Sequence, residues 1–476
     1  MNRLKFITFA LCSLIFCTAT TACEGNNDNT EDPTPQVNDY GMSLNIPNNT
    51  ITYKSINSDT IHIAYRNAFG DATIVSNSYS ASKGYGTIKF NKVVSSIDSE
   101  AFKNQKSIIT MVLPSSVKKI ENDAFSKCSQ MNSIHLANGL DSIGDNAFNS
   151  CSSLASITIP KSVKYIGNNA FEKCDKLNKV NINDITAWCN IDFMNYKSNP
   201  LHIAGLLYIN DVLISHLTIP GTVSVIKNNA FFNTQSINSL SIENGTTEIG
   251  NNAFSDCSAL TSITLPNTLI SIGDLAFAEC TSLKAANIPN SVITLGIGVF
   301  NTCTALTTAF IGNAITSISR LTFYNCNNLH SVTIGNSVTS IGERAFYNCQ
   351  ALKEITLPQS LTSIHTYAFF QCISLTSIEI PDAVTTIADN AFNRCIGFTS
   401  ITLGSSLTQI QRAAFTYCYN LREVHCKAII PPTIDATTFD YDTRRICTLY
   451  VPKGYYYPYK EAMSWCVFYK IIERHF

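Results

Sequence analysis

Among the reactive residue types of this 476-residue chain, cysteine has the most regular spacing, and disulfide formation is the chemistry that such a spacing first suggests. Eleven of the eighteen cysteines lie three residues after a recurring phenylalanine: Cys128, Cys151, Cys174, Cys257, Cys280, Cys303, Cys326, Cys349, Cys372, Cys395 and Cys418. In an exported protein, such a series could form disulfides. However, Gln105 and Thr234 fill the same slot without a partner, and the side chains would point in parallel. We therefore expect a ladder of free, buried thiols that pack as small apolar residues, with disulfides as the alternative.

The other reactive residues form no pattern typical of a catalytic or metal site. The eight histidines are scattered: His62, His135, His202, His216, His330, His365, His425 and His475. No C-x-x-C pair, HExxH, GxSxG, P-loop or glycine-rich dinucleotide motif is present. The sequence therefore predicts a protein that is not an enzyme and binds neither a metal nor a cofactor.

The phenylalanine that precedes the cysteines returns at one constant interval. One run comprises Phe102, Phe125, Phe148 and Phe171, and a second comprises Phe231, Phe254, Phe277, Phe300, Phe323, Phe346, Phe369, Phe392 and Phe415. The residue five before each Phe is Ile in twelve of thirteen units, and the residue just before it is Ala in eleven. A fixed period of this length indicates a solenoid, in which each unit buries its apolar face against its neighbours.

Within one repeat, the spacing Leu-x-x-Ile-x-Leu followed by Pro or Gly, as at Leu260 to Pro266, predicts a short strand with alternate residues inward. A second inward pair follows, for example Leu269 and Ile272, and then a polar turn leads to Ala-Phe. The expected fold is a repeat solenoid of about 13–15 coils, with parallel β-strands on one face and short turns or irregular segments on the other. Both ends should be capped.

The repeat unit C-x-x-L-x-x-I-x-L-P-x-S-L-x-x-I-G-x-x-A-F resembles the BspA-like leucine-rich repeat, the 23-residue bacterial type, over residues 86–439. Residues 447–473 also resemble the closing strand and helix of that family. The resemblance implies an exported surface protein with an adhesive role toward host matrix proteins or other cells. The periodicity by itself indicates only a solenoid.

The N-terminus has the three-part layout of a secretory signal. Arg3 and Lys5 precede an apolar run from Phe6 to Phe16, and small residues lead to Cys23. The segment Thr20-Thr21-Ala22-Cys23 resembles the lipobox of bacterial lipoproteins, although Thr20 stands where an aliphatic residue is commoner. Cys23 is therefore the expected lipidation site; a plain signal peptide with an incidental cysteine is the alternative.

The expected domain organisation has five parts. Residues 1–22 are the lipoprotein signal peptide, 23–38 a polar, disordered tether, 39–90 an N-terminal β cap that enters the first coil at Ile88, 91–439 the solenoid, and 440–476 a C-terminal cap of a strand plus a short helix. The 60-residue interval between Phe171 and Phe231 predicts an island insertion near 185–212, with a hairpin turn at Asn210-Asp211. The island is either a binding element or a structural insertion that changes curvature.

The outward positions of the strands, seven, eight and ten residues after each Phe, are the expected binding surface. Of these 39 positions, 19 hold Ser or Thr, which simply suit an exposed strand. Among the other 20 positions, nine aromatic or charged residues stand out and are therefore candidate contacts. They are Lys284, Phe310, His330, Lys353, Glu354, Glu379, Arg422, Glu423 and His425.

The function predicted from these features is macromolecule binding by a monomeric lipoprotein of the outer membrane, exposed at the cell surface. Its partner would be a protein or glycan ligand at the surface, and the lipid would attach it to the membrane. With a net charge of −1 and 14% charged residues, the chain lacks the excess of positive charge that is typical of nucleic-acid-binding proteins. The alternatives are a glycan-binding surface lipoprotein that serves polysaccharide uptake and a structural envelope protein.

Overall fold

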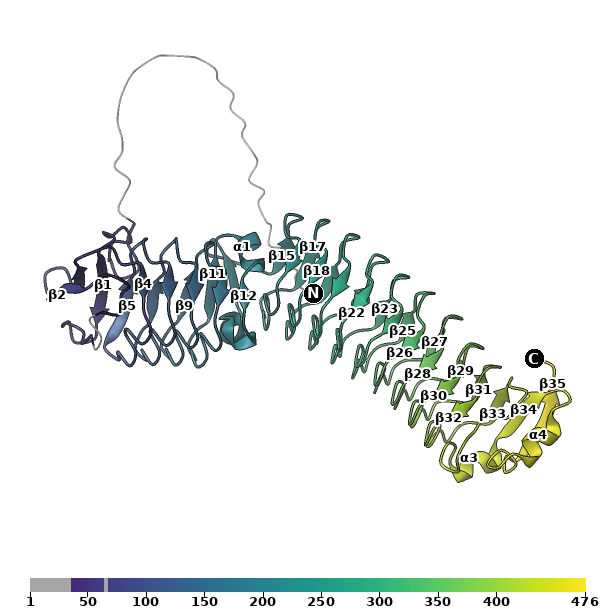
Figure 1. Ribbon diagram of the computed structural model, residues 1–476. Coiled ribbons are helices and arrows are strands. Elements are labelled where there is room, and N and C mark those ends of the chain that lie inside the picture. The colour runs from purple at the N-terminus through teal and green to yellow at the C-terminus, as the bar shows by residue number, and fades with distance from the viewer. Residues whose placement is uncertain (1–35, 64–66) are drawn as a thin grey trace, which may run out of the picture.

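The computed structural model describes residues 36–63 and 67–476, which form one continuous stack of coils with a cap at each end (Figure 1). The expected signal segment, the lipidation site Cys23 and most of the tether lie outside the described residues. The stack is a parallel β-solenoid of about 16 coils, so the solenoid prediction is confirmed. Within the described ranges, no helix has the length and apolar content needed to cross a membrane.

The N-terminal cap is an antiparallel extension of the solenoid's own sheet. Its strands are β1 (Thr50–Ser55), β2 (Ile74–Ser80) and β3 (Tyr85–Phe90), in the order β2-β3-β1. Strand β1 pairs antiparallel with both β3 and the first solenoid strand, β5 (Ile108–Val112). Ile88 lies opposite Ile51 in this pairing, so it belongs to the cap and does not open the first coil as expected. The sheet therefore starts without an exposed parallel edge.

One side of every coil carries a strand of two to five residues, and these strands form parallel ladders. They are β5, β7 (Ser133–His135), β9 (Ser156–Ile159), β11 (Lys179–Ile182), β13 (Leu207–Ile209), β15 (His216–Ile219), β17 (Ser239–Ile242), β19 (Ser262–Thr264), β21 (Ala285–Asn287), β23 (Thr308–Phe310), β25 (Ser331–Thr333), β27 (Glu354–Ile355), β29 (Ser377–Glu379), β31 (Ser400–Leu403) and β33 (Glu423–Cys426). Within each ladder, a strand residue pairs with its equivalent in the next repeat, as Thr308 does with Ser331. Equivalent side chains therefore form rows along the stack.

A second side carries two-residue strands that include the recurring aliphatic residue five before each Phe, except that β12 of the island has Phe193 in its place. They are β4 (Ser96–Ile97), β6 (Lys119–Ile120), β8 (Ser142–Ile143), β10 (Tyr165–Ile166), β12 (Asp192–Phe193), β16 (Val225–Ile226), β18 (Glu248–Ile249), β20 (Ser271–Ile272), β22 (Thr294–Leu295), β24 (Ser317–Ile318), β26 (Ser340–Ile341), β28 (Ser363–Ile364), β30 (Thr386–Ile387) and β32 (Gln409–Ile410). The aliphatic residue points inward, and Ile341, for example, is fully buried.

The third side, which we call the Phe-turn side, runs from three residues before each repeat Phe to two residues after it. It has no assigned strand, yet its amides bind the next coil: Phe323 N–H donates to the carbonyl of Ala345 at 2.8 Å, and Asn325 N–H to that of Tyr347 at 2.9 Å. The residues two before and two after the Phe adopt positive φ, as Leu321 (61°) and Asn325 (58°) do. Asn tolerates this left-handed region better than most residues, which explains its frequency there.

The repeat phenylalanines form the centre of the core. Within each run their rings stack on the neighbouring coil with centroids 5.0–5.8 Å apart and planes within 16° of each other. Two residues outside the period extend the row of rings: Phe439 stacks on Phe415 at 5.1 Å, and Phe69 meets Phe102 edge-on at 5.6 Å. All four of these rings are fully buried.

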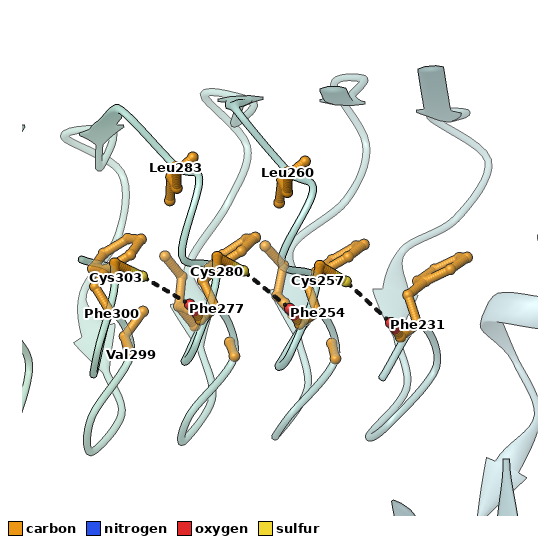
Figure 2. Close-up of a cluster of buried hydrophobic side chains, with 14 of the residues drawn as sticks. Phe231, Phe254, Cys257, Leu260, Phe277, Cys280, Leu283, Val299, Phe300 and Cys303 are labelled. Carbon is orange, nitrogen blue, oxygen red and sulfur yellow. Dashed lines mark hydrogen bonds between the residues drawn. The ribbon is translucent and has the colours of Figure 1, made fainter. Parts of the chain in front are cut away.

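The recurring cysteines line the core beside the phenylalanines, and the expectation of buried thiols is confirmed. All eleven are fully buried and free. Each thiol donates to the carbonyl of the repeat Phe one coil earlier, as Cys280 Sγ does to Phe254 at 3.2 Å (Figure 2). Cys447 and Cys466 are also free.

The island lies within the stack. It comprises α1 (Ile185–Cys189), β12, a 3-10 turn (Tyr196–Ser198), α2 (Leu201–Ala204), β13 and β14 (Val212–Leu213). Strand β13 pairs parallel with β11 and antiparallel with β14, and Asn210 and Asp211 make the predicted hairpin turn with φ of 49° and 65°. The buried Trp188 donates from Nε1 to the carbonyl of Ala230 at 2.8 Å. The stack changes direction here (Figure 1), which favours the structural interpretation.

The C-terminal cap continues the strand side with two further parallel strands, β34 (Thr448–Pro452) and β35 (Lys470–Arg474). Two short helices cross the end of the stack, α3 (Tyr441–Ile446) and α4 (Tyr456–Glu461). Tyr459, Trp465 and Phe468 are buried at this end of the stack. Met463 is 88% exposed because α4 ends at Glu461, and Met463 lies beyond the helix.

Candidate functional site

The strand face is the set of outward side chains at positions seven, eight and ten after each repeat Phe. Successive coils bring these positions into three rows, because equivalent residues of neighbouring repeats lie opposite one another in the paired strands β15–β19, β21–β27 and β29–β33. Neighbouring strands in a sheet lie about 4.8 Å apart. Side chains at equivalent positions of neighbouring coils therefore stand close enough to act on one ligand.

The structure places one group of candidates near the middle of this face. Lys284, His330 and Lys353 lie in the row seven after the Phe, and all three are exposed. His330 and Lys353 occupy adjacent coils, joined by a hydrogen bond from Lys353 N–H to the His330 carbonyl at 3.3 Å. Glu354, also exposed, pairs with Ser331 of the preceding strand. These residues thus form a mixed-charge strip rather than a pocket.

Phe310 stands in the third row, between Asn287 and Thr333 on the neighbouring strands. Its ring is half-buried, so it presents apolar surface among short polar side chains. A partly exposed aromatic residue with this kind of surround is typical of an interface contact.

A second group lies at the C-terminal end of the strand face. We call it the terminal cluster: Glu423, His425, Tyr450, Arg474 and Phe476. The Glu423 carboxylate lies 3.1 Å from His425 Nε2, and Arg474 lies 3.2 Å from His425 Nδ1. The His425 ring stacks on Tyr450 with centroids 4.5 Å apart and planes 10° apart. The Arg474 guanidinium is 5.9 Å from the rings of both Tyr450 and Phe476.

The burial of His425 corrects its expected role as a free outward contact. Only 9% of this residue is exposed, because β34 and β35 continue the sheet beside it. His425 therefore orders the cluster, whereas Glu423 keeps 48% of its side chain exposed. Tyr450, Arg474 and Phe476 were missed by sequence reasoning, since they lie outside the repeat. For Tyr450, the alternation of apolar residues that is expected of a strand over Thr448–Pro452 could have indicated its outward position.

The two remaining candidates lie near the cluster but do not join it. Arg422 is exposed and donates to the carbonyl of Tyr419 at 3.0 Å. Glu379 accepts a hydrogen bond from Lys427 Nζ at 2.8 Å, and this bond raises the pKa of Lys427. The Glu379 side chain remains 64% exposed, so it is still accessible to a ligand.

Chemically, these groups suit recognition by ion pairs, hydrogen bonds and stacking. Within residues 36–63 and 67–476, no three His, Cys, Asp or Glu side chains are grouped so as to hold a metal ion. The buried thiols are poor nucleophiles, because burial raises the pKa of Cys303, for example, to about 12.

Comparison with known proteins identifies the repeat. The family model described as "BspA type Leucine rich repeat region (6 copies)" matches residues 72–199, 206–330 and 316–445. The chain belongs to the BspA-type leucine-rich repeat family. Membership indicates a bacterial surface protein with a binding or adhesion role, on a scaffold that is generally non-enzymatic. No curated protein matches this BspA-type chain.

Solved structures resemble the BspA-type solenoid to different degrees. A leucine-rich repeat protein from Bacteroides ovatus is 26% identical, with a TM-score of 0.55 over 76% of this chain and 88% of that one. A leucine rich cell surface protein from Faecalibacterium prausnitzii is 27% identical, with a TM-score of 0.39 over 70% and 83% of the two chains. The pneumococcal vaccine antigen PcpA is 19% identical, with a TM-score of 0.40 over 81% and 85%.

Proposed function

We propose that this BspA-type protein is exported, attached by a lipid at Cys23 to the outer membrane, and binds a protein of the host matrix or of another cell through its strand face. The observation that carries the proposal is the terminal cluster. There, Glu423 and Arg474 are held by His425 beside Tyr450 at the end of a continuous, exposed strand face. Side chains that are ordered before binding lose less entropy when a partner docks.

The dimensions of the strand face suit a protein partner. From His330, beside β25, to Arg474 in β35 the strand face crosses six strand intervals, or about 29 Å at the usual strand spacing. An ordinary protein interface buries about 800 Å² per partner, which corresponds to a patch about 28 Å across. His330, Lys353 and Glu354 therefore fit with the terminal cluster within one such interface, and Lys284 lies outside it.

The composition of the patch also suits a protein partner. Tyr and Arg are enriched at the centres of protein interfaces, and Tyr450 and Arg474 occupy the cluster together. Around them, exposed Ser and Thr side chains provide a polar rim that hydrogen-bonds readily without fixing a single ligand shape.

Export and anchoring rest on the sequence of the N-terminus. The charged residues Arg3 and Lys5, the apolar run and the Thr20–Cys23 segment together support a lipoprotein signal. The polar residues 24–38 then support a tether that holds the solenoid away from the lipid.

A binding screen tests the proposal. The full chain, purified in detergent, is presented to immobilised matrix proteins, and the affinity of any ligand is measured for the parent and for Arg474→Ala. We expect Arg474→Ala to weaken binding about tenfold or more, because an ordered interface arginine is removed. Arg412→Ala, on a different side of the coil, is the charge-matched control and should bind like the parent. Equal affinity of parent and Arg474→Ala would contradict the role of the cluster.

A glycan-binding lipoprotein that serves polysaccharide uptake is the second candidate, and a structural envelope protein the third. The glycan candidate is supported by a different side of the molecule, where aromatic and arginine side chains line a groove.

A further inference from the structure

A hollow lies on the Phe-turn side, away from the strand face. Its volume is about 680 Å³, and it spans the coils from Asn301 to Tyr417. The hollow is within the size range of small-ligand sites, which are usually apolar or aromatic with a few directed polar groups. We call it the aromatic groove and define it by Tyr324, Tyr347, Tyr367, Phe370, Arg344 and Arg394.

A ladder of aromatic rings forms the floor of the groove, one ring from each of three coils. Tyr324 and Tyr347 stack with centroids 4.9 Å apart and planes 18° apart, and Tyr347 and Phe370 stack at 4.8 Å and 13°. These residues directly follow the repeat Phe, so the ladder runs parallel to the core stack but on the outside. Tyr367 meets Phe370 edge-on at 5.5 Å and forms a wall.

The polar groups of the groove are mainly donors. Arg320, Arg344 and Arg394 line it, and no carboxylate does. Glu343 lies beside it and compensates part of this charge, at 3.6 Å from Arg320 and 2.8 Å from Arg344. Arg394 is exposed, forms no ion pair with a described residue, and lies over the Tyr417 ring at 5.3 Å. Three arginines and one glutamate leave a net positive charge of two.

One buried polar atom in the groove has no partner. Asn393 directly follows the repeat Phe of the next coil, which is the position that the aromatic rings occupy in the three preceding coils. This residue is only 6% exposed. Its Nδ2 donates to Asn390 Oδ1 at 2.9 Å, but its Oδ1 accepts no hydrogen bond from the part of the chain that the structure describes. An unsatisfied buried amide is costly, so its presence at the lining suggests that a ligand completes it.

We infer that the aromatic groove binds an extended acidic polysaccharide, whose sugars carry carboxylate or sulfate groups. Arginine forms bidentate hydrogen bonds with such anions, and the Arg344 and Arg394 guanidinium groups lie on aromatic rings that hold them in place. The phenol hydroxyls of Tyr324, Tyr347 and Tyr417 form no hydrogen bond with described residues, and they are available for sugar hydroxyls.

The spacing of the groove also favours a polysaccharide. The ladder repeats once per coil, with ring centroids 4.9 and 4.8 Å apart, and an extended polysaccharide repeats once per sugar at a similar distance. Alternate side chains of an extended peptide are spaced more widely, at about twice 3.3 Å. A nucleic acid would require a longer positive track to match its phosphates than three arginines provide. The inference does not depend on the proposed protein ligand, because the two surfaces use different sides of the coil.

The test uses the full chain in detergent with defined polymers. Polygalacturonate supplies carboxylates, dextran sulfate supplies sulfates, and dextran is the neutral control. We expect binding to one or both acidic polymers and none to dextran. Arg394→Ala should weaken that binding about tenfold or more, whereas Lys161→Ala, which removes one positive charge from an exposed position near the N-terminal end of the solenoid, should retain it. Tyr347→Phe keeps the ring stack and serves as a variant that should fold normally but bind more weakly.

The other outcomes overturn the inference. Equal weakening by Arg394→Ala and Lys161→Ala would mean attraction by overall charge without a site. Binding of poly-glutamate or poly-uridylate in preference to both acidic polysaccharides would assign the groove to a peptide or to RNA. Absence of binding to either acidic polymer would show that the groove is not a polysaccharide site, whether or not a matrix protein binds the strand face.

Discussion

The thiol of Cys326 donates a hydrogen bond to the carbonyl oxygen of Phe300 at 3.1 Å. The same bond recurs at all eleven cysteines of the ladder, always to a residue 26 positions earlier. The Phe300 carbonyl also accepts the backbone N–H of Cys303 at 3.2 Å, so the thiol of the next coil supplies a second hydrogen bond to it from a buried position. This bond explains the cysteine-rich composition of the chain without any disulfide.

The thiols should react only when the chain unfolds. Burial raises the pKa of Cys128, Cys174 and Cys303 to about 12, so these thiols stay protonated and shielded at pH 8. Because unfolding returns each thiol to its ordinary pKa of 9.0, the contribution of the ladder to stability is present below pH 9 and falls as the pH rises toward 12. Alkylation followed by non-reducing mass spectrometry checks this prediction. A bond between Cys326 and Cys349 would refute it.

The phenylalanine stack should dominate the stability of each coil. We expect Phe323→Ala to lower the free energy of unfolding by about 3–5 kcal/mol, because the ring is fully buried between Phe300 and Phe346. Thr308→Ala, at an exposed strand position, should change it by less than about 0.5 kcal/mol. Chemical denaturation of the parent and both variants measures the difference. Similar losses for the two variants would show that the stack is not the main contributor.

A carboxyl pair on the Phe-turn side should make the stability of the fold change with pH in the mildly acidic range. Burial, together with the neighbouring Glu279 carboxylate, raises the pKa of Asp256 to about 6. A raised acid pKa stabilises the fold below the ordinary value of 3.8, and this stabilisation is lost as the pH rises through 6. Asp256→Asn should therefore raise stability at pH 7 by about 1 kcal/mol, after allowance for its partial exposure. A melting temperature for this variant no higher than that of the parent at pH 7 would contradict the prediction.

The sequence predicted the features that recur in every repeat and missed the features that depart from the repeat. The constant spacing of the repeat Phe was enough to predict the coils and the Phe core. Phe439 and Phe69 were missed because neither keeps the repeat interval from the ring that it contacts, Phe415 or Phe102. His425 was expected to be outward, but β34 and β35 bury it, and these strands carry no repeat signature. The aromatic groove was missed because the position after the repeat Phe is aromatic in only a few coils, so only stacking in space reveals it.

Anchoring can be tested independently of the fold. Replacing Cys23 with Ser or Ala should abolish acylation and release the protein from the membrane fraction, because the thiol is the attachment point of the lipid. Metabolic labelling with a fatty acid and cell fractionation measure both effects. A Cys23→Ala protein that stays membrane-bound and lipid-labelled would show that the processing site lies elsewhere.

The role of the island in ligand binding should be tested by substitutions and not by deletion. Removing 185–212 would also remove Trp188 and Asn199, whose side chains bond to the carbonyls of Ala230 and Asn229. Met194 (52% exposed) and Leu213 (47%) can be changed to Ser instead, with little expected effect on stability. Loss of ligand binding in these variants, with the strand-face variants unaffected, would assign recognition to the island.

Ligand affinity of strand-face variants is the measurement that tests the account most directly. For any matrix protein that the parent binds, we compare Phe310→Ser and the double variant Lys353→Ala/Glu354→Ala with the parent, and record the melting temperature of each. Their side chains lie outward, while Leu306 and Leu352 stay buried beneath them. We expect parent-like melting and binding weakened by about 2 kcal/mol or more for the aromatic anchor. Unchanged affinity in both variants would show that the strand face is scaffold and would contradict the proposed function.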